Sequence, residues 1–438
     1  MTKHINSSEA LPSEAHLWLM PHTQTAIKET KTICIYPETS IENSDTIPFT
    51  IPALPKCQLE NIKVVAEIKV TNEAGAALAA TANVSVAPHL AAVLFQNVVA
   101  SIGNQQITQS FDNSYFAFKF WETMLHTIQP KGENSAIEQE ERFLLDDTDD
   151  KTGSENVTFY EIANDAAPVN KNGKKRADWL KDRKVIRTVS NLNIPLFTQG
   201  QLLPPNIEIK LNLVKNDASF ILLAAANDTS KVHFEKVYLK CKFKQPTDVV
   251  LNLIEERLAK SNAIYHADKK LLSYHPIPTG VTDVTIDNLF NGVLPYFFMV
   301  GVQTRGALAR DRSKNPCSLH KMERVQLYID GQQHFPHDIE STNSKYDTYM
   351  LSTFLEESGR INNGESAAYY NYNTYPIFAF DLTADKSQNQ NGLNLQKSGS
   401  ARLSIGFENE TPADYILMVL AYYDQIIEIT KEREIIFV

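Results

Sequence analysis

Ile102-Gly103-Asn104-Gln105-Gln106 and, much later in the chain, Ile329-Asp330-Gly331-Gln332-Gln333 are two versions of one sequence pattern. Each follows a short apolar run, and each is followed by an aromatic, helix-like stretch, at residues 115–121 in the first case and 346–351 in the second. The pattern therefore indicates that one structural unit occurs twice.

A second matching pair supports the repeat. Residues 211–222 and 405–417 both contain an apolar run, a short polar stretch and a second apolar run, and they close the two halves of the chain. The order of elements is kept and the repeat is as long as a domain, which indicates two similar domains in tandem. Two copies of one β-rich unit without a catalytic signature favour a building block over an enzyme.

The bulk composition fits a globular protein of two to three domains. The chain has 438 residues and a formal net charge of −10, which argues against a surface devoted to nucleic-acid binding. The first 21 residues lack the apolar region of a secretory signal, and no apolar stretch approaches the roughly 20 residues of a membrane span. The four cysteines show no metal-binding spacing and are expected to be reduced core thiols: Cys34, Cys57, Cys241 and Cys317.

Short strands dominate the expected secondary structure. Residues 207–213 alternate apolar and polar side chains, which predicts a half-buried strand of an antiparallel sheet. Strands are also expected at 33–36, 62–70, 232–243, 281–289, 294–302, 324–329, 377–382, 402–407 and 415–423. So many short strands, in two sets, indicate two β-sandwiches or barrels.

Two segments have helical spacing. Val250, Leu253, Ile254 and Leu258 predict a short amphipathic helix that links the two halves. An aromatic face within 115–125 is expected to pack on a sheet as part of the core, through Tyr115, Phe118, Trp121, Met124 and Leu125.

A charged excursion interrupts the first half. An acidic stretch at 138–150 precedes a basic one at 171–184, and we expect a long loop over residues 131–183. One interpretation is a solvated loop whose charges offset one another. The alternative is a nuclear-import signal formed by Lys174, Lys175, Arg176, Lys181, Arg183 and Lys184.

No motif of known chemistry is evident, and we expect no catalytic residue, no cofactor and no metal. His334, His337 and Asp338 could ligate zinc, but Pro336 interrupts their spacing, so a turn is the preferred interpretation.

The tyrosine-rich segment at 368–375 is a candidate interface, because tyrosine suits contact surfaces; the alternative is a loop packed on its own domain. The candidate interface residues are Tyr369, Tyr370, Tyr372 and Tyr375.

An ordered series of motifs resembles the double-jelly-roll major capsid proteins of Polinton/Maverick elements, adintoviruses and related eukaryotic DNA viruses. In the second half the series is 288–295, 314–317, 325–331, 378–383 and 422–429; in the first half it is 195–197, 207–213 and 217–220. The resemblance runs from about residue 30 to the C-terminus. Cys317 departs from it, because an aromatic residue more often follows Asn-Pro in this family.

The resemblance implies an all-β fold of two tandem eight-stranded jelly rolls, with short helices in connecting loops. The expected divisions are an N-terminal arm at 1–30, a first jelly roll at 31–246, a linker helix at 247–260 and a second jelly roll at 261–438. It further implies a non-enzymatic major capsid protein, whose homotrimeric, pseudo-hexagonal capsomers tile an icosahedral shell around double-stranded DNA.

The implied partners are further copies of the chain, penton proteins and minor capsid proteins, without sequence-specific nucleic-acid binding or a membrane span. The implied location is the virion capsid, after synthesis in the host cytoplasm and with assembly in the nucleus left open. Two alternatives remain: a carbohydrate-binding or carbohydrate-active protein built on tandem β-sandwiches, and a minor or domesticated capsid-like protein that does not tile.

Overall fold

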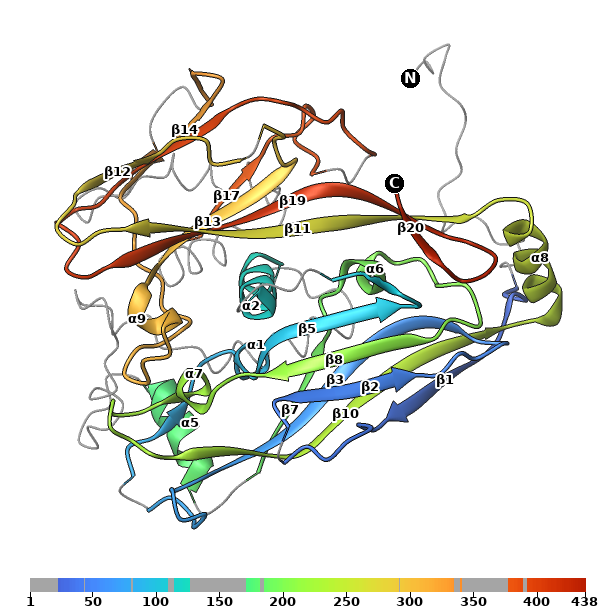
Figure 1. The fold of residues 1–438 in the computed structure, drawn as a ribbon, viewed down its shortest axis with the longest axis horizontal. Helices are drawn as coiled ribbons and strands as arrows, with labels where there is room; N and C mark the ends of the chain where they lie inside the picture. Colours follow the sequence, from blue (N-terminus) through green and yellow to red (C-terminus); the bar gives the residue numbers. More distant parts are fainter. Residues whose placement is uncertain are drawn as a thin grey trace, which may run out of the picture.

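The computed structural model describes residues 23–42, 44–79, 82–108, 114–126, 171–181, 185–290, 292–334, 339–340, 377–388 and 392–438. Strands dominate, and the helices are short (Figure 1). Among the described residues, no helix is long and apolar enough to cross a membrane.

Two four-stranded sheets form the first half of the molecule. One has the order β1-β10-β3-β7 and consists of Ile27–Ile35, Lys231–Pro246, Gln58–Thr71 and Ile186–Asn191. The other has the order β2-β8-β5-β6 and consists of Thr46–Ile51, Ile209–Lys215, Phe95–Ile102 and Gln105–Gln106. Their inner faces share one core that contains Phe49, Ile62, Leu211 and Leu239. The predicted alternation is confirmed in β8, where Ile209, Leu211 and Leu213 are buried while Lys210 and Asn212 are exposed.

The second half repeats this arrangement. One sheet has the order β11-β19-β13-β17, formed by Ala263–Ile277, Tyr415–Ile429, Phe297–Thr304 and Phe378–Asp381, with β20 (Ile435–Phe437) paired to β19. The other has the order β12-β18-β14-β15, formed by Asp283–Ile286, Ala401–Gly406, Arg324–Ile329 and Gln332–Gln333, with β16 (Ile339–Glu340) paired to β14.

The two halves have the same topology, strand for strand. In chain order, the strands of the first half that correspond to β11, β12, β13, β14, β15, β17, β18 and β19 are β1, β2, β3, β5, β6, β7, β8 and β10. All of these pairings are antiparallel. Eight antiparallel strands in two packed sheets with this order form a jelly roll, so the predicted double jelly roll is confirmed.

The sequence repeat is one hairpin in equivalent strands. Ile102 pairs with Gln105 across the turn from β5 to β6, and Ile329 pairs with Gln332 across the turn from β14 to β15. In the first turn Gly103 has a φ of 58°, and in the second turn both residues have positive φ, 50° at Asp330 and 78° at Gly331. Two-residue hairpin turns require this conformation, which explains the glycine in both copies.

Helices fill the space between and beside the sheets. α2 (Ser114–His126) lies between the two jelly rolls, and α8 (Asp248–Leu258) connects β10 to β11 at one end of the molecule (Figure 1). The remaining helices of the described residues are α1 (Leu90–Val93), α5 (Lys171–Leu180), α6 (Pro195–Thr198), α7 (Ala218–Ile221) and α9 (Arg305–Leu308). A small sheet pairs β4 (Ser85–Val86) with β9 (Leu222–Leu223).

Two differences from the sequence prediction concern the boundaries of the N-terminal arm and of the long loop. The expected arm reaches residue 30, but β1 already begins at Ile27, because the polar residues Thr30 and Thr32 pair with β10 through the backbone. The expected loop ends in helix α5, which packs against β4 and buries Ala177 and Leu180. Residues 131–170 of that loop lie outside the described residues, and the exact domain limits stay a prediction.

Candidate functional site

In the sheet β11-β19-β13-β17, strands β13 and β17 and the first part of β19 are buried on both faces, and this sheet forms the contact between the jelly rolls. Val300 and Val419 point into the core of the second half, whereas Met299 and Leu420 belong to the core of the first half. Every residue of β13 except its last is therefore buried. This pattern fits strands covered on two sides, which carry continuous rather than alternating apolar runs.

Helix α2 provides the surface on which this sheet rests. Trp121 is fully buried, and its indole ring lies against β13 at Gly301. Tyr115 is buried too, which confirms the predicted core role for these two members of the aromatic face, while Phe118 packs on the core in a half-buried position. The structure does not describe the side chains of Met124 and Leu125.

Polar contacts also join the two halves. Arg312 Nη1 donates to the carbonyl oxygen of Asp228 at 2.8 Å and to its Oδ1 at 3.1 Å. Cys317 Sγ donates to Pro88 O at 3.1 Å, and Tyr265 Oη donates to Leu202 O at 2.9 Å. Each of these hydrogen bonds joins a residue of the first jelly roll to a residue of the second, so the two jelly rolls form one continuous unit.

The equivalent sheet face of the first half has a different character. In β3 and β10 the inward residues, such as Ile62 and Cys241, are buried, while the outward row carries Lys63 directly opposite Lys240. Like charges at opposed positions are unfavourable for the sheet itself. The same face also holds ion pairs, with Lys244 Nζ 3.0 Å from Glu60 Oε1 and Arg187 Nη2 2.6 Å from Glu67 Oε1.

We define the charged face as the outward side of the sheet β1-β10-β3-β7. It corresponds by strand order to the side of β11-β19-β13-β17 that packs on α2. Its strongest positive charge lies on β10 and β3, at Lys63, Lys236, Lys240, Lys242 and Lys244. These residues are exposed or half-buried, and a polar, exposed surface of this kind suits contacts that form between separately folded chains.

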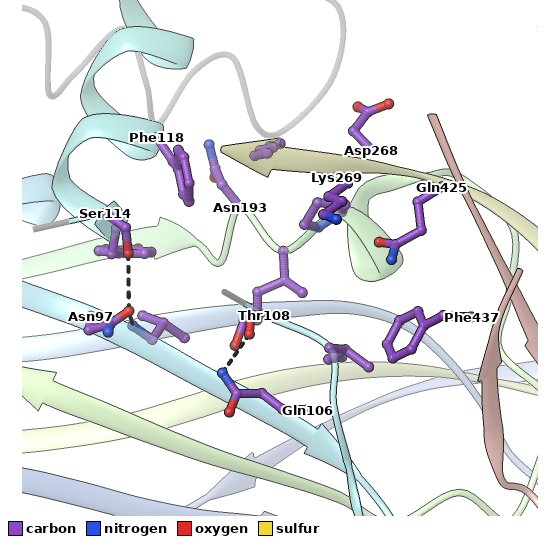
Figure 2. A pocket seen from close by; sticks show the side chains of 16 residues that line it. Asn97, Gln106, Thr108, Ser114, Phe118, Asn193, Asp268, Lys269, Gln425 and Phe437 are labelled. Atoms are coloured by element: carbon purple, nitrogen blue, oxygen red, sulfur yellow. Dashed lines mark hydrogen bonds between the residues drawn. The ribbon is translucent and has the colours of Figure 1, made fainter. Parts of the chain in front are cut away.

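A cavity of about 180 Å³ lies between the jelly rolls (Figure 2). It is lined by residues from both halves: Asn97, Gln106, Thr108, Ser114, Phe118, Asn193, Asp268, Lys269, Gln425 and Phe437 are labelled in the figure. Several of its polar groups are hydrogen-bonded within the protein. Ser114 Oγ donates to Asn97 Oδ1 at 3.3 Å, Gln106 Nε2 donates to Thr108 O at 2.6 Å, and Tyr296 Oη donates to Asp268 Oδ1 at 2.8 Å.

Among the described residues that line it, this cavity does not present the pair of carboxylates that glycosidases generally use. Asp268 contributes the one carboxylate among the described lining residues, whereas glycosidases generally use two. In the part of the chain that the structure describes, no three or more His, Cys, Asp or Glu side chains are grouped so that they could hold a metal ion. His334 Nε2 lies 3.2 Å from Lys386 Nζ, and residues 335–338 of the histidine motif lie outside the described residues.

The predicted nuclear-import segment stays a prediction, but Arg176 within it is not exposed. This residue lies in α5, is buried, and donates from Nε to Val86 O at 3.0 Å. Lys181 is paired with Asp178, at 2.9 Å between Nζ and Oδ1. Lys174 and Lys175 belong to the same helix, and Arg183 and Lys184 lie outside the described residues.

The tyrosine interface is not tested. Tyr369, Tyr370, Tyr372 and Tyr375 all lie outside the described residues.

Sequence reasoning missed the contact between the jelly rolls, although the continuous apolar runs at 297–302 and 415–422 were a signal that these strands are covered on both faces.

Three solved structures that share this fold come from viruses. A chain from the Sputnik virophage matches with a TM-score of 0.62 and 10% identity over 99% of this chain and 93% of that one. The mavirus major capsid protein matches with a TM-score of 0.54 and 11% identity, over 100% of this chain and 96% of that one. A chain of the PBCV-1 virus capsid matches with a TM-score of 0.56 and 10% identity, over 94% of this chain and 97% of that one. No family model and no curated protein matches the chain. The likeness shows a double jelly roll along nearly the whole chain.

Proposed function

We propose that this chain is a major capsid protein whose homotrimers form pseudo-hexagonal capsomers, and that these tile an icosahedral shell around a double-stranded DNA genome. The full-length likeness to the mavirus major capsid protein and to the PBCV-1 capsid chain supports a capsid role. One observation carries the proposal for a ring-forming trimer: the two jelly rolls have the same topology, but they contact each other through different surfaces.

The contact within the chain is head-to-tail. The second jelly roll contributes the outer face of β11-β19-β13-β17, while the first contributes a different surface, around α2. Among the described residues, a contact between two unlike surfaces leaves one of each unused, namely the charged face on the first jelly roll and, on the second, the side equivalent to the one that carries α2 in the first. The same contact can therefore be repeated from one copy to the next.

Repetition of a head-to-tail contact closes a ring when the rotation between units allows it. With two jelly rolls in each chain, a ring of six lobes contains three chains. The charged face would then lie against the second jelly roll of the next copy. An interface between chains is commonly more polar than a contact within one core, which agrees with the lysine-rich character of this face.

Lys240→Glu tests this arrangement. The new carboxylate lies opposite Lys63, so it replaces a like-charge pair by an ion pair and should not destabilise the monomer. We expect the dissociation constant of the trimer to rise by about tenfold or more, a change of about 1.4 kcal/mol, because a charge at the interface is reversed. Unfolding of the diluted monomer should be unchanged.

Lys210→Glu is the matched control. Lys210 projects from the exposed side of β8, on the other sheet of the same jelly roll. The two substitutions make the same charge change, so only the one on the charged face should weaken the trimer. Equal effects, or no effect of Lys240→Glu, would exclude the charged face as the trimer contact.

Shell formation distinguishes the proposed role from that of a non-tiling, capsid-like protein. A major capsid protein should form closed shells or hexagonal sheets from its trimers, seen by electron microscopy. Penton and minor capsid proteins are the further partners proposed, within the virion capsid. A trimer that never tiles, with or without such partners, would favour the non-tiling role.

A further inference from the structure

The apolar stripe of α8 is largely left open by the rest of the described chain. Of the four residues that predicted an amphipathic helix, Leu258 is buried, Val250 and Ile254 are half-buried, and Leu253 is 53% exposed. Val249, one turn before Leu253, is more exposed still. A surface helix ordinarily turns such a stripe into a core.

All four residues line one groove. A volume of about 420 Å³ lies between this side of α8 and a second wall formed by Gln58, Pro204, Ala263 and Tyr265. The second wall is fixed, because Tyr265 is buried and its hydroxyl donates to Leu202 O. Contiguous apolar surface of this kind marks a place where another segment docks.

The N-terminal segment enters the described structure beside this helix. Thr247, the residue that precedes α8, donates its backbone N–H to Ala26 O at 2.9 Å. Residues 1–22 lie outside the described residues and are mostly polar, with one run of four apolar side chains, Leu17-Trp18-Leu19-Met20.

We propose that Leu17-Trp18-Leu19-Met20 occupies the α8 groove of its own chain and so acts as an N-terminal strap. Met20 precedes Ala26 by six residues, which can span about 20 Å when extended. Eleven helical residues make α8 about 16 Å long, so the strap reaches the whole groove. A short tether also gives a local concentration of the order of millimolar, which favours the chain's own segment over that of another copy.

The strap would place apolar side chains against Val250, Leu253 and Ile254. It would also cover the one connection that passes directly from β10 to β11, and thus the junction between the jelly rolls. Arg257 lines the groove as well, and Glu14 lies three residues before the apolar run, so the charges are compatible with this placement. The proposal concerns a surface separate from the charged face and does not depend on the capsid role.

Trp18 supplies its own probe. The difference between the emission spectra of the full-length protein and of its Trp18→Phe variant isolates Trp18 from the other tryptophans. We expect a blue-shifted difference spectrum and weak quenching by acrylamide. Leu253→Glu should shift that spectrum to the red and raise the quenching constant several-fold, because a carboxylate in the groove repels the apolar run.

Leu395→Glu is the control, since this leucine is 93% exposed in a loop away from the groove and should leave Trp18 unchanged. Circular dichroism must show that both variants are folded. A Trp18 spectrum typical of water in the wild type, or one insensitive to Leu253→Glu, would overturn the proposal. Protection that disappears on tenfold dilution would also overturn it, since a second copy would then fill the groove. Light scattering on the same samples reports trimer formation separately.

Discussion

The indole ring of Trp121 lies against the backbone of Gly301, so that helix α2 of the first jelly roll touches strand β13 of the second. A Cβ atom at residue 301 would lie 3.1 Å from Cζ2 and 3.3 Å from Cη2 of the ring, and 3.6 Å from Leu319 Cδ1. The two aromatic atoms are thus closer than ordinary contact distance. Glycine at this position allows the jelly rolls to approach as closely as they do.

Gly301→Ala should destabilise the protein. The added methyl group must displace a fully buried ring, and overpacking of a core typically costs about 1–3 kcal/mol in the free energy of unfolding. Combination with Trp121→Phe should reduce the added cost of the alanine, because the smaller ring leaves room. Denaturant unfolding of the four proteins in this cycle measures the coupling.

Gly306→Ala is the control for that experiment. Gly306 lies in α9 without positive φ. The atom nearest to a Cβ added at this residue would be Lys314 Cγ, at 3.6 Å. The alanine should be neutral or stabilise the protein by up to about 1 kcal/mol through its helix propensity. Equal destabilisation by both alanines would contradict the packing argument for Gly301.

Arg312→Ala should loosen the attachment between the jelly rolls. Arg312 and Asp228 are 16% and 24% exposed, and the alanine leaves two acceptors of Asp228 without this donor. We expect a loss of about 1–3 kcal/mol. Arg305→Ala provides the comparison, because Arg305 and Asp414 are 68% and 56% exposed and 3.8 Å apart; such a surface pair contributes about 0–1 kcal/mol. Similar losses of unfolding free energy for both variants would contradict the role of Arg312 in joining the jelly rolls.

The cysteines should differ sharply in reactivity. Burial raises the pKa of Cys241 to about 12, with a smaller contribution from nearby Cys34, so at pH 8 the native thiol is almost entirely protonated. The thiolate is the reactive form, and Cys34 is exposed on β1. Mass spectrometry after brief alkylation at pH 8 should find the label on Cys34, with Cys241 modified only after denaturation. Equal labelling of both would show that β1 separates readily from β10.

The sequence was a good guide wherever its pattern was local. The expected strand at 324–329 is β14, residue for residue, and the duplicated hairpin revealed the equivalence of the halves. β1 was partly missed because Thr30 and Thr32 are held by pairing with a strand more than two hundred residues away. Local composition carries little information about such a pairing.

The contact between the jelly rolls could be anticipated only in part. The aromatic face of α2 predicted burial of Trp121, but not that Gly301 would be the residue beneath it, since tertiary contacts join positions with no fixed spacing. Arg176 shows the opposite error. A basic run suggested exposure, whereas the fold buries this arginine and uses its Nε to satisfy the carbonyl of Val86.

The most direct test of the capsid proposal is the mass of the purified full-length protein by light scattering, with negative-stain images of the same fraction. The proposal predicts a particle of three 49.3 kDa chains with a six-lobed outline, or larger shells built from it. A stable monomer at every concentration, with neither rings nor shells in the images, would contradict it.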